Sequence, residues 1–220
     1  MRRVTEVLLL ASLGLTAGTA GCTSSAGGAQ PGPSPRVTSA TGTFAAYSPG
    51  ATAVTYDPAL VPPGAVATLS ITQTSSDSRV WFTVAGLLPD RGYGVHLHME
   101  PCGATGDAAG PHYQHRHPPV PPTAPSPPGP VSAPARPSVS PVVSASVSPP
   151  PANPSYVNPQ NEVWLDITTR ADGRGSAVAT HPWTFDQAPR SLVIHASPTK
   201  TGAGQAGDAG PRVACLTLPE

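Results

Sequence analysis

Short runs in which apolar and polar residues alternate constrain the fold of this chain more than any other feature. In 67–72, 80–84 and 163–168 every second residue is aliphatic or aromatic. The residues between them are Thr, Ser, Asp or Trp. Such alternation is typical of strands with one buried face, and no segment shows a sustained helical period. Gly, Pro and an Asp-Gly pair at 172–173 separate the runs. We therefore predict an all-β fold, an antiparallel β-sandwich or barrel of about eight strands, at 52–56, 65–74, 79–86, 93–98, 162–169, 175–181, 191–196 and 212–218.

A proline-rich stretch interrupts this pattern between residues 118 and 159. It contains 16 of the 31 prolines and almost no charged or aromatic residue. Such a composition cannot bury enough apolar surface to fold, and it favours an extended, polyproline-like chain. We interpret the stretch as a tolerated surface insertion. The alternative is a spacer or glycosylated loop that contacts the cell wall.

The N-terminus has the features of an export signal. A basic start (MRR) precedes an apolar stretch at 7–15, which is too short to cross a bilayer, and small residues then lead to Cys22. Cleavage before Cys22 would leave a cysteine that resembles the lipidated N-terminus of a bacterial lipoprotein. We therefore expect a signal peptide at 1–21, a lipidated Cys22 that anchors the chain to the membrane, a flexible tether over 22–50 and the folded domain at 51–220. The protein would then be exported to the outer face of the membrane; the alternative is an ordinary secretory signal and a secreted protein.

The charge balance argues against one class of partner. The chain has 12 Lys and Arg residues and 12 Asp and Glu residues, and only 11% of all residues are charged. Because nucleic-acid binding needs a basic patch or stripe, we expect no nucleic-acid partner.

Four histidines are the candidate metal ligands. His96 and His98 lie one residue apart on a predicted strand, so their side chains project from one face and can share a metal ion. His112 follows a Gly-rich loop, and His195 ends an apolar strand. An all-imidazole site of this kind suits copper or zinc. His181 lies on a different predicted strand and is expected to be a surface or packing residue.

Five short motifs follow one another along the chain: GLLP at 86–89, His-x-His at 96–98, GPHY at 110–113, VIH at 193–195 and GPRVAC at 210–215. Their order resembles that of the copper/zinc superoxide dismutase family. That resemblance covers roughly residues 64–117 and 161–218 and implies a Greek-key β-barrel that converts superoxide to oxygen and hydrogen peroxide at copper. It further implies that the four histidines ligate copper, that His112 takes part in catalysis, and that Arg212 guides the anionic substrate. A homodimer is a further expectation from the resemblance. Family members associate through different surfaces, so the sequence does not indicate which surface would form the interface.

The same resemblance implies a disulfide between Cys102 and Cys215. In an exported protein whose Cys22 carries the anchor, these two cysteines form an even pair in an oxidising compartment. The alternative is a pair of free thiols.

The sequence departs from the family mainly in the zinc half of the site. His115 follows His112 closely, and the proline-rich stretch then begins. Glu162 and Asp166 share one face of a predicted strand, and His115 with either of them could complete a zinc site beside His112. The alternative is that zinc is absent and that Glu162 orients His112 through a hydrogen bond. Residues 197–200 (SPTK) stand where the family has an acidic residue that links its two metal sites.

The sequence thus predicts an exported superoxide dismutase with copper as its cofactor, and leaves zinc open. One alternative is an envelope lipoprotein that binds copper or zinc with little or no turnover. Another is a structural envelope protein with a vestigial metal site. The presence of Arg212 favours the enzyme, because a metal store does not need an arginine that attracts an anion.

Overall fold

The structure is a computed structural model that describes residues 34–119 and 155–220. The predicted signal peptide, Cys22, the start of the tether and most of the proline-rich stretch lie outside the described residues. In the described part, the helical element is a single 3-10 turn, η1 (Gly106–Ala109). No helix of that part is long and apolar enough to cross a membrane.

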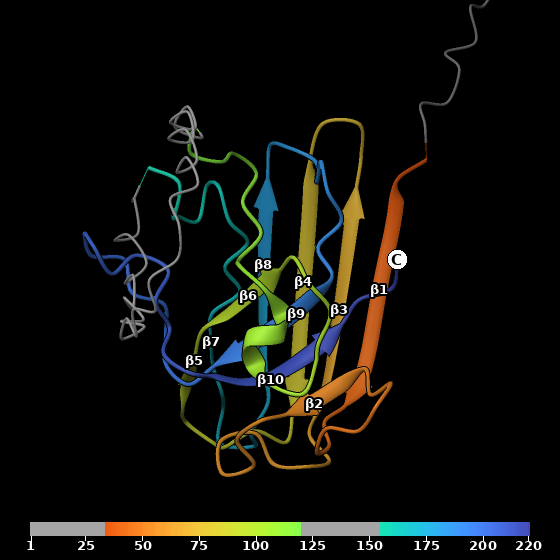
Figure 1. The fold of residues 1–220 in the computed structure, drawn as a ribbon, viewed down its shortest axis with the longest axis vertical. Helices are drawn as coiled ribbons and strands as arrows, with labels where there is room; N and C mark the ends of the chain where they lie inside the picture. The colour runs from red at the N-terminus through yellow and green to blue at the C-terminus, as the bar shows by residue number, and fades with distance from the viewer. Residues whose placement is uncertain (1–33, 120–154) are drawn as a thin grey trace, which may run out of the picture. The chain divides into compact units, whose positions relative to one another are not determined.

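Two antiparallel four-stranded sheets form the fold, as predicted (Figure 1). Strands β4 (Ser78–Ala85) and β8 (Gly175–His181) are neighbours although β5 (Gly92–Tyr93), β6 (Val95–His98) and β7 (Ile167–Thr168) come between them in the sequence, a long-range return of the Greek-key kind. The first sheet has the order β1 (Arg36–Thr43), β3 (Val66–Gln73), β4 (Ser78–Ala85) and β8 (Gly175–His181). The second has the order β2 (Ala53–Thr55), β10 (Arg212–Thr217), β9 (Ser191–His195) and β6 (Val95–His98), and β5 (Gly92–Tyr93) pairs with β7 (Ile167–Thr168).

The alternation in the sequence corresponds to the faces of the strands. In β4, Val80 and Phe82 are fully buried, whereas Trp81 between them is 54% exposed on the outer face. The sequence predicts that the tryptophans in strand patterns pack in the sandwich, and for Trp81 this prediction is wrong. The core between the sheets also contains Ala67, Leu69, Ile71, Val84, Val95, Leu97, Leu192, Ile194 and Leu216.

The domain begins earlier than predicted. The region assigned to a tether over 22–50 includes β1, which pairs along its whole length with β3, and Phe44, which is fully buried in the core. The inner face of β1 consists of small residues, and a Cβ on Gly42 would lie 2.6 Å from the Cβ of Ala53. The strand fits against the second sheet because its inward residues are small, so it lacks an apolar alternation.

Two other boundaries differ from the prediction. Within 162–169 only Ile167–Thr168 forms a strand, while Trp164 makes an isolated bridge with His96. At the end of the predicted proline-rich insertion, residues 155–159 form turns. There the Oδ1 of Asn158 accepts hydrogen bonds from the backbone N–H groups of Gln160 and Asn161.

Candidate metal centre

The register of the second sheet gathers the candidate residues on its outer face. His96 lies opposite Val193 in the β6–β9 pair, and Cys215 lies opposite the same Val193 in the β10–β9 pair. His98 and His195 are two residues along their strands from His96 and Val193, so they share this face. The candidate metal ligands and the disulfide therefore lie on one side of the sheet, with the hydrophobic core on the other.

A β-bulge brings Arg212 to the same face. Arg212 lies opposite His195 and Ala214 lies opposite Ile194, so two steps along β10 match one step along β9. In a regular strand, Arg212 would share the inward face of Ala214. The extra residue, Val213, reverses that direction and places the guanidinium on the side of the histidines.

Two segments distant in the sequence border the other edge of β6. The backbone N–H of Tyr113 donates to Leu97 O (2.8 Å), which holds His112 next to His98 as an isolated bridge. The N–H of Leu165 donates to Val95 O (2.8 Å), and Trp164 forms the bridge with His96 already noted. Because both segments pair with the strand that carries His-x-His, backbone hydrogen bonds fix their side chains relative to it.

Four histidine rings converge at this place. One nitrogen from each of His96, His98, His112 and His195 lies within 4.8 Å of the others. The shortest approach joins His96 Nδ1 to His112 Nε2, at 3.0 Å. His96 and His98 are almost completely buried. The four residues could hold one metal ion with four nitrogen ligands, and they are the histidines that the sequence indicates.

The second nitrogen of each ring is held by the protein. His98 Nδ1 lies 3.0 Å from Gly110 O, and His195 Nδ1 lies 3.1 Å from Gly210 O. Both glycines have a positive φ, 70° and 75°, a conformation that favours glycine. A carbonyl only accepts, so each Nδ1 carries the hydrogen, and among the described residues the Nε2 of His98 and of His195 has no hydrogen-bond partner. Two buried nitrogens without partners, both at the centre of the cluster, are what metal ligands require.

Burial keeps the rings of His96, His98 and His195 neutral. Burial, with a smaller contribution from the neighbouring His112, lowers the pKa of His98 to about 2 and that of His195 to about 4. Burial also holds the pKa of His96 well below its usual value, with His112 again contributing. Neutral imidazole is the form that binds a metal ion, so protons do not compete with a metal for these rings at neutral pH.

Glu162 is committed to hydrogen bonds around His112. Its Oε2 lies 3.0 Å from His112 Nδ1 and accepts from Trp164 Nε1 at 2.8 Å, and its Oε1 accepts from Gln114 Nε2 at 2.8 Å. Glu162 is 1% exposed. Its carboxylate is thus satisfied by three protein donors and orients His112, which is the second of the two roles that the sequence left open.

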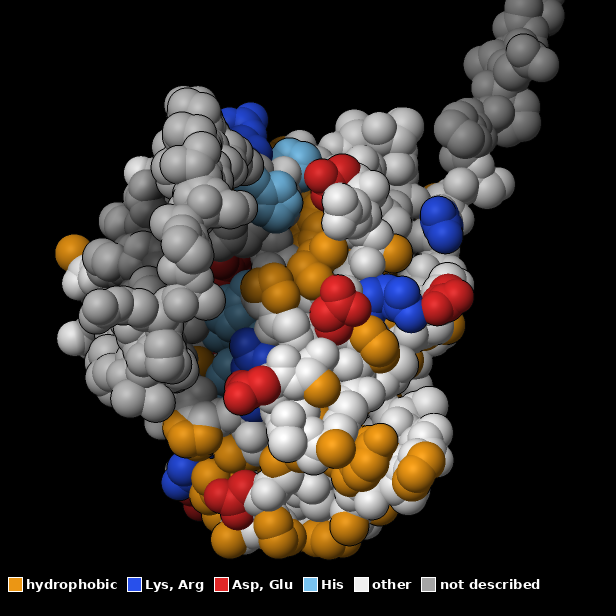
Figure 2. All heavy atoms as spheres, viewed as in Figure 1, with side chains coloured by type: hydrophobic (Ala, Val, Ile, Leu, Met, Phe, Trp, Pro, Cys, Tyr) orange, Lys and Arg blue, Asp and Glu red, His pale blue; other side chains and the backbone are white. Residues whose placement is uncertain are grey.

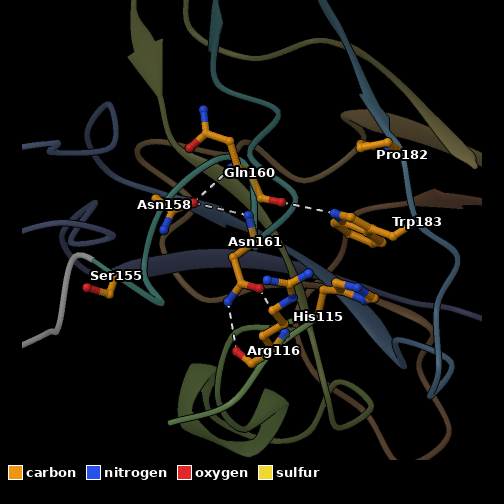
Figure 3. A pocket seen from close by; sticks show the side chains of 8 residues that line it. All are labelled: His115, Arg116, Ser155, Asn158, Gln160, Asn161, Pro182 and Trp183. Atoms are coloured by element: carbon orange, nitrogen blue, oxygen red, sulfur yellow. Dashed lines mark hydrogen bonds between the residues drawn. The ribbon is translucent and has the colours of Figure 1, made fainter.

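The residues suggested for zinc do not come together. His115 stacks on Trp183, with ring centroids 4.6 Å apart and planes inclined by 4° (Figure 3). It is not one of the four histidines whose ligand atoms converge. Asp166 accepts from the backbone and hydroxyl of Thr199 instead. The predicted set of His115 with Glu162 or Asp166 is therefore not assembled, and the donors present do not fit a zinc ion beside His112.

The cavity near His115 is separate from the four-histidine cluster, because none of the four histidines lines it. It has a volume of about 440 Å³ and is lined by Arg116, Asn161, Trp183 and others (Figure 3). Asn161 Nδ2 donates to Arg116 O, and Trp183 Nε1 donates to Gln160 O, so these polar groups fix the local chain. His181 stacks on Trp183 as well and is 4% exposed, which confirms it as a packing residue.

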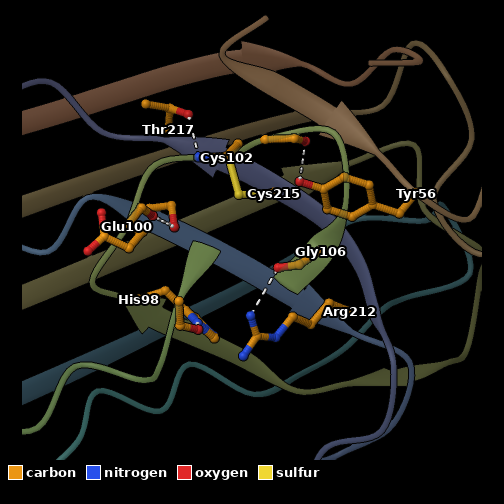
Figure 4. The surroundings of a disulfide bond; sticks show 11 residues. Tyr56, His98, Glu100, Cys102, Gly106, Arg212, Cys215 and Thr217 are labelled. Carbon is orange, nitrogen blue, oxygen red and sulfur yellow. Dashed lines mark hydrogen bonds between the residues drawn. A yellow bond between two sulfur atoms is a disulfide. The ribbon is translucent and has the colours of Figure 1, made fainter. Parts of the chain in front are cut away.

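The predicted disulfide between Cys102 and Cys215 is present, with the two Cα atoms 5.7 Å apart. It joins β10 to the loop that carries η1 (Figure 4). In the same region Arg212 Nη1 donates to Gly106 O at 3.0 Å, and Tyr56 Oη donates to Gly103 O at 3.0 Å. The disulfide therefore fixes the loop whose carbonyls hold both Arg212 and, through Gly110, His98.

An open cavity of about 620 Å³ leads to His112. Its lining includes Met99, Gln114, Glu162 and Arg212. The guanidinium of Arg212 points toward His98 (Figure 4). Burial lowers its pKa below the usual value, with Asp107 opposing that shift, yet an arginine stays charged in proteins. Histidine side chains reach the surface on the face seen in Figure 2, with Lys or Arg side chains close by.

Sequence reasoning missed several groups that shape the site. No sequence motif predicts that the carbonyls of Gly110 and Gly210 accept hydrogen bonds from histidines. The same holds for the indole of Trp164, which donates to Glu162. Thr199, whose Oγ1 lies 2.7 Å from His96 Nε2, stands in the segment where an acidic residue was expected.

No protein-family model matches this chain, and no curated protein matches it. Among solved structures, a copper/zinc superoxide dismutase from Brucella abortus is similar to it at a TM-score of 0.48 and 16% sequence identity. That similarity covers 84% of this chain and 100% of the other.

The fold and the site define a class of protein. It is an antiparallel β-sandwich that carries, on the outer face of one sheet, a buried cluster of four histidines able to hold a metal ion.

Proposed function

We propose that this protein is an exported, copper-dependent superoxide dismutase. The observation that carries the proposal is the convergence of four histidine rings beside the guanidinium of Arg212, two of them with Nε2 atoms that have no partner among the described residues. The motif resemblance supplies the reaction: two superoxide ions and two protons give oxygen and hydrogen peroxide. When bound, copper supplies the one-electron oxidation and reduction that this reaction needs.

The chemistry of the donors supports copper at the cluster and no zinc beside it. Four imidazoles suit Cu(II) well, and copper binds nitrogen sites more tightly than the other divalent first-row metals. His96, His98, His112 and His195 would hold the ion, through Nδ1 of His96 and Nε2 of the others. Because Glu162 already accepts three protein hydrogen bonds, it takes the place beside His112 that zinc would need.

His112 and Glu162 are suited to handle a proton. His112 is the most exposed ring of the cluster and lines the open cavity. With its Nδ1–H donated to Glu162, the ring has one lone pair, at Nε2; whenever that atom does not hold the metal, the ring could take up a proton there and pass it to the product peroxide. The Glu162 carboxylate, 3.0 Å from Nδ1, stabilises the imidazolium that forms.

The exported location is also a proposal. The disulfide supports an oxidising compartment, and the leader sequence supports a lipid anchor at Cys22 on the outer face of the membrane. Contact with the cell wall is the alternative role that the composition of the proline-rich stretch offers, and a homodimer is an expectation from the family resemblance alone.

Reconstitution separates this proposal from its alternatives. We expect the purified protein to take up one copper per chain and to dismutate superoxide with copper alone, and added zinc should not raise the activity. Stoichiometric copper without turnover would favour a copper-binding lipoprotein. Activity that requires zinc would contradict the interpretation of Glu162.

Arg212→Ala should lower the dismutation rate by at least about tenfold and flatten its dependence on salt, while copper content stays at one per chain. Steering raises association rates by about 10- to 1000-fold, a general range for which superoxide dismutases are themselves a standard case. Arg212→Lys, which keeps the charge, should retain most of the salt dependence. Unchanged rates in Arg212→Ala, measured by stopped flow at several ionic strengths, would show that the guanidinium does not guide the substrate.

A further inference from the structure

A chain of hydrogen bonds runs from Asp166 to one of the four rings through Thr199. Thr199 Oγ1 donates to Asp166 Oδ1 at 2.6 Å, and the backbone N–H of Thr199 donates to Asp166 Oδ2 at 2.6 Å. The same Oγ1 lies 2.7 Å from His96 Nε2. The direct separation of His96 Nε2 and Asp166 Oδ1 is 3.8 Å, so the hydroxyl lies between the ring and the carboxylate.

The direction of these bonds follows from the hydroxyl. A threonine has one hydroxyl hydrogen, and an ionised carboxylate accepts only. Because Thr199 gives its hydrogen to Asp166, its oxygen must accept from His96. The ring therefore carries its hydrogen at Nε2 and leaves Nδ1 with a free lone pair.

We propose that Asp166 and Thr199 form a positioning pair that fixes the tautomer of His96 and so makes Nδ1 the metal-binding atom. This proposal rests on the proposed function, which takes the metal to be copper.

The fixed tautomer has a consequence at the centre of the cluster. Glu162 holds the hydrogen of His112 at Nδ1, so the lone pairs of His96 Nδ1 and His112 Nε2 face each other at 3.0 Å. Together with the free Nε2 atoms of His98 and His195, four lone pairs converge where a cation would sit.

The surrounding loop does not depend on the hydroxyl alone. The N–H of Gly94 donates to Ser197 O (2.8 Å), and the N–H of Lys200 donates to Asp208 O (2.8 Å). Lys200 Nζ also bonds Asp208 Oδ2 at 2.7 Å. A substitution that removes only the hydroxyl of Thr199 therefore leaves the loop tied on both sides of this residue.

The test compares Thr199→Val, which keeps the shape and loses the hydroxyl, with Thr199→Ser, which keeps the hydroxyl. Thr201→Val is the matched control, because Thr201 is exposed on the same loop. Nitrogen-15 NMR of the metal-free proteins reports the tautomer of His96, and competition with a chelator reports Cu(II) affinity. We expect the Nε2–H form in the wild type, Thr199→Ser and Thr201→Val. In Thr199→Val we expect a mixture of tautomers and about 10- to 100-fold weaker copper binding.

The two proposals fail in different ways. A wild type that binds no Cu(II) would overturn the copper function, while the change of His96 tautomer in Thr199→Val would still support the positioning pair. Normal copper binding together with the same tautomer in the wild type and Thr199→Val would overturn the positioning pair and leave the function intact. Weaker binding in Thr199→Val that Thr199→Ser does not restore would also count against it.

Discussion

His98→Ala is expected to remove tight copper binding and to lower the rate of superoxide dismutation by more than about 100-fold. Losing a metal ligand should cost more than losing a hydrogen-bond partner of a ligand, which typically costs about 10- to 100-fold. His98 is fully buried, its Nδ1 is fixed by Gly110 O, and its Nε2 has no partner in the part of the chain that the structure describes. No exposed side chain can replace a ligand at that depth. Copper content by mass spectrometry and dismutation by stopped flow measure both effects.

The matched control for this prediction is His117→Ala. His117 is exposed and lies outside the four-histidine cluster. Its replacement should leave copper content and activity at the wild-type level, and thermal unfolding of the metal-free proteins checks that each variant folds. Equal copper content in His98→Ala and His117→Ala would show that the metal binds elsewhere.

Replacing both Cys102 and Cys215 by Ser should lower the free energy of unfolding by about 2–5 kcal/mol. The disulfide links residues 113 positions apart, and in the chain-entropy model a loop of that length contributes roughly 4–5 kcal/mol. Urea unfolding of the wild type and the double variant measures the difference. A difference in the free energy of unfolding below about 1 kcal/mol would contradict this prediction.

The same variant should also change the site. The loop that the disulfide holds supplies Gly106 O to Arg212 and Gly110 O to His98. We therefore expect weaker copper binding and a lower dismutation rate even under conditions where the double variant remains folded. Full activity in the folded variant would show that the hydrogen bonds of Tyr56 and Thr217 hold the loop without the disulfide.

The sandwich could be predicted from the sequence because its strands alternate. Each of Leu69, Phe82 and Leu165 lies in an apolar series at every second position, and each is buried. Strand β1 escaped prediction because its inward residues include Ala40 and Gly42, and at Gly42 even a Cβ would lie 2.6 Å from the Cβ of Ala53. A strand without an apolar series cannot be distinguished from a polar tether by pattern alone.

The candidate site divides in a similar way. The four histidines and the cysteine pair were evident because their residue types and spacing carry chemical meaning. The direction of Arg212 depends on a bulge, and the tautomer of His96 depends on the hydroxyl of Thr199. Strand register and hydroxyl hydrogen bonds of this kind depend on segments far apart in the chain, so a local sequence pattern cannot predict them.

The most direct test of the account is the position of copper in the loaded protein. Crystals of the copper form, measured at the copper absorption edge, should show one anomalous peak per chain, bonded to Nδ1 of His96 and Nε2 of His98, His112 and His195. The carboxylate of Glu162 should remain on His112, with no second metal beside it. A peak bonded to other residues, or no peak after reconstitution, would contradict the account.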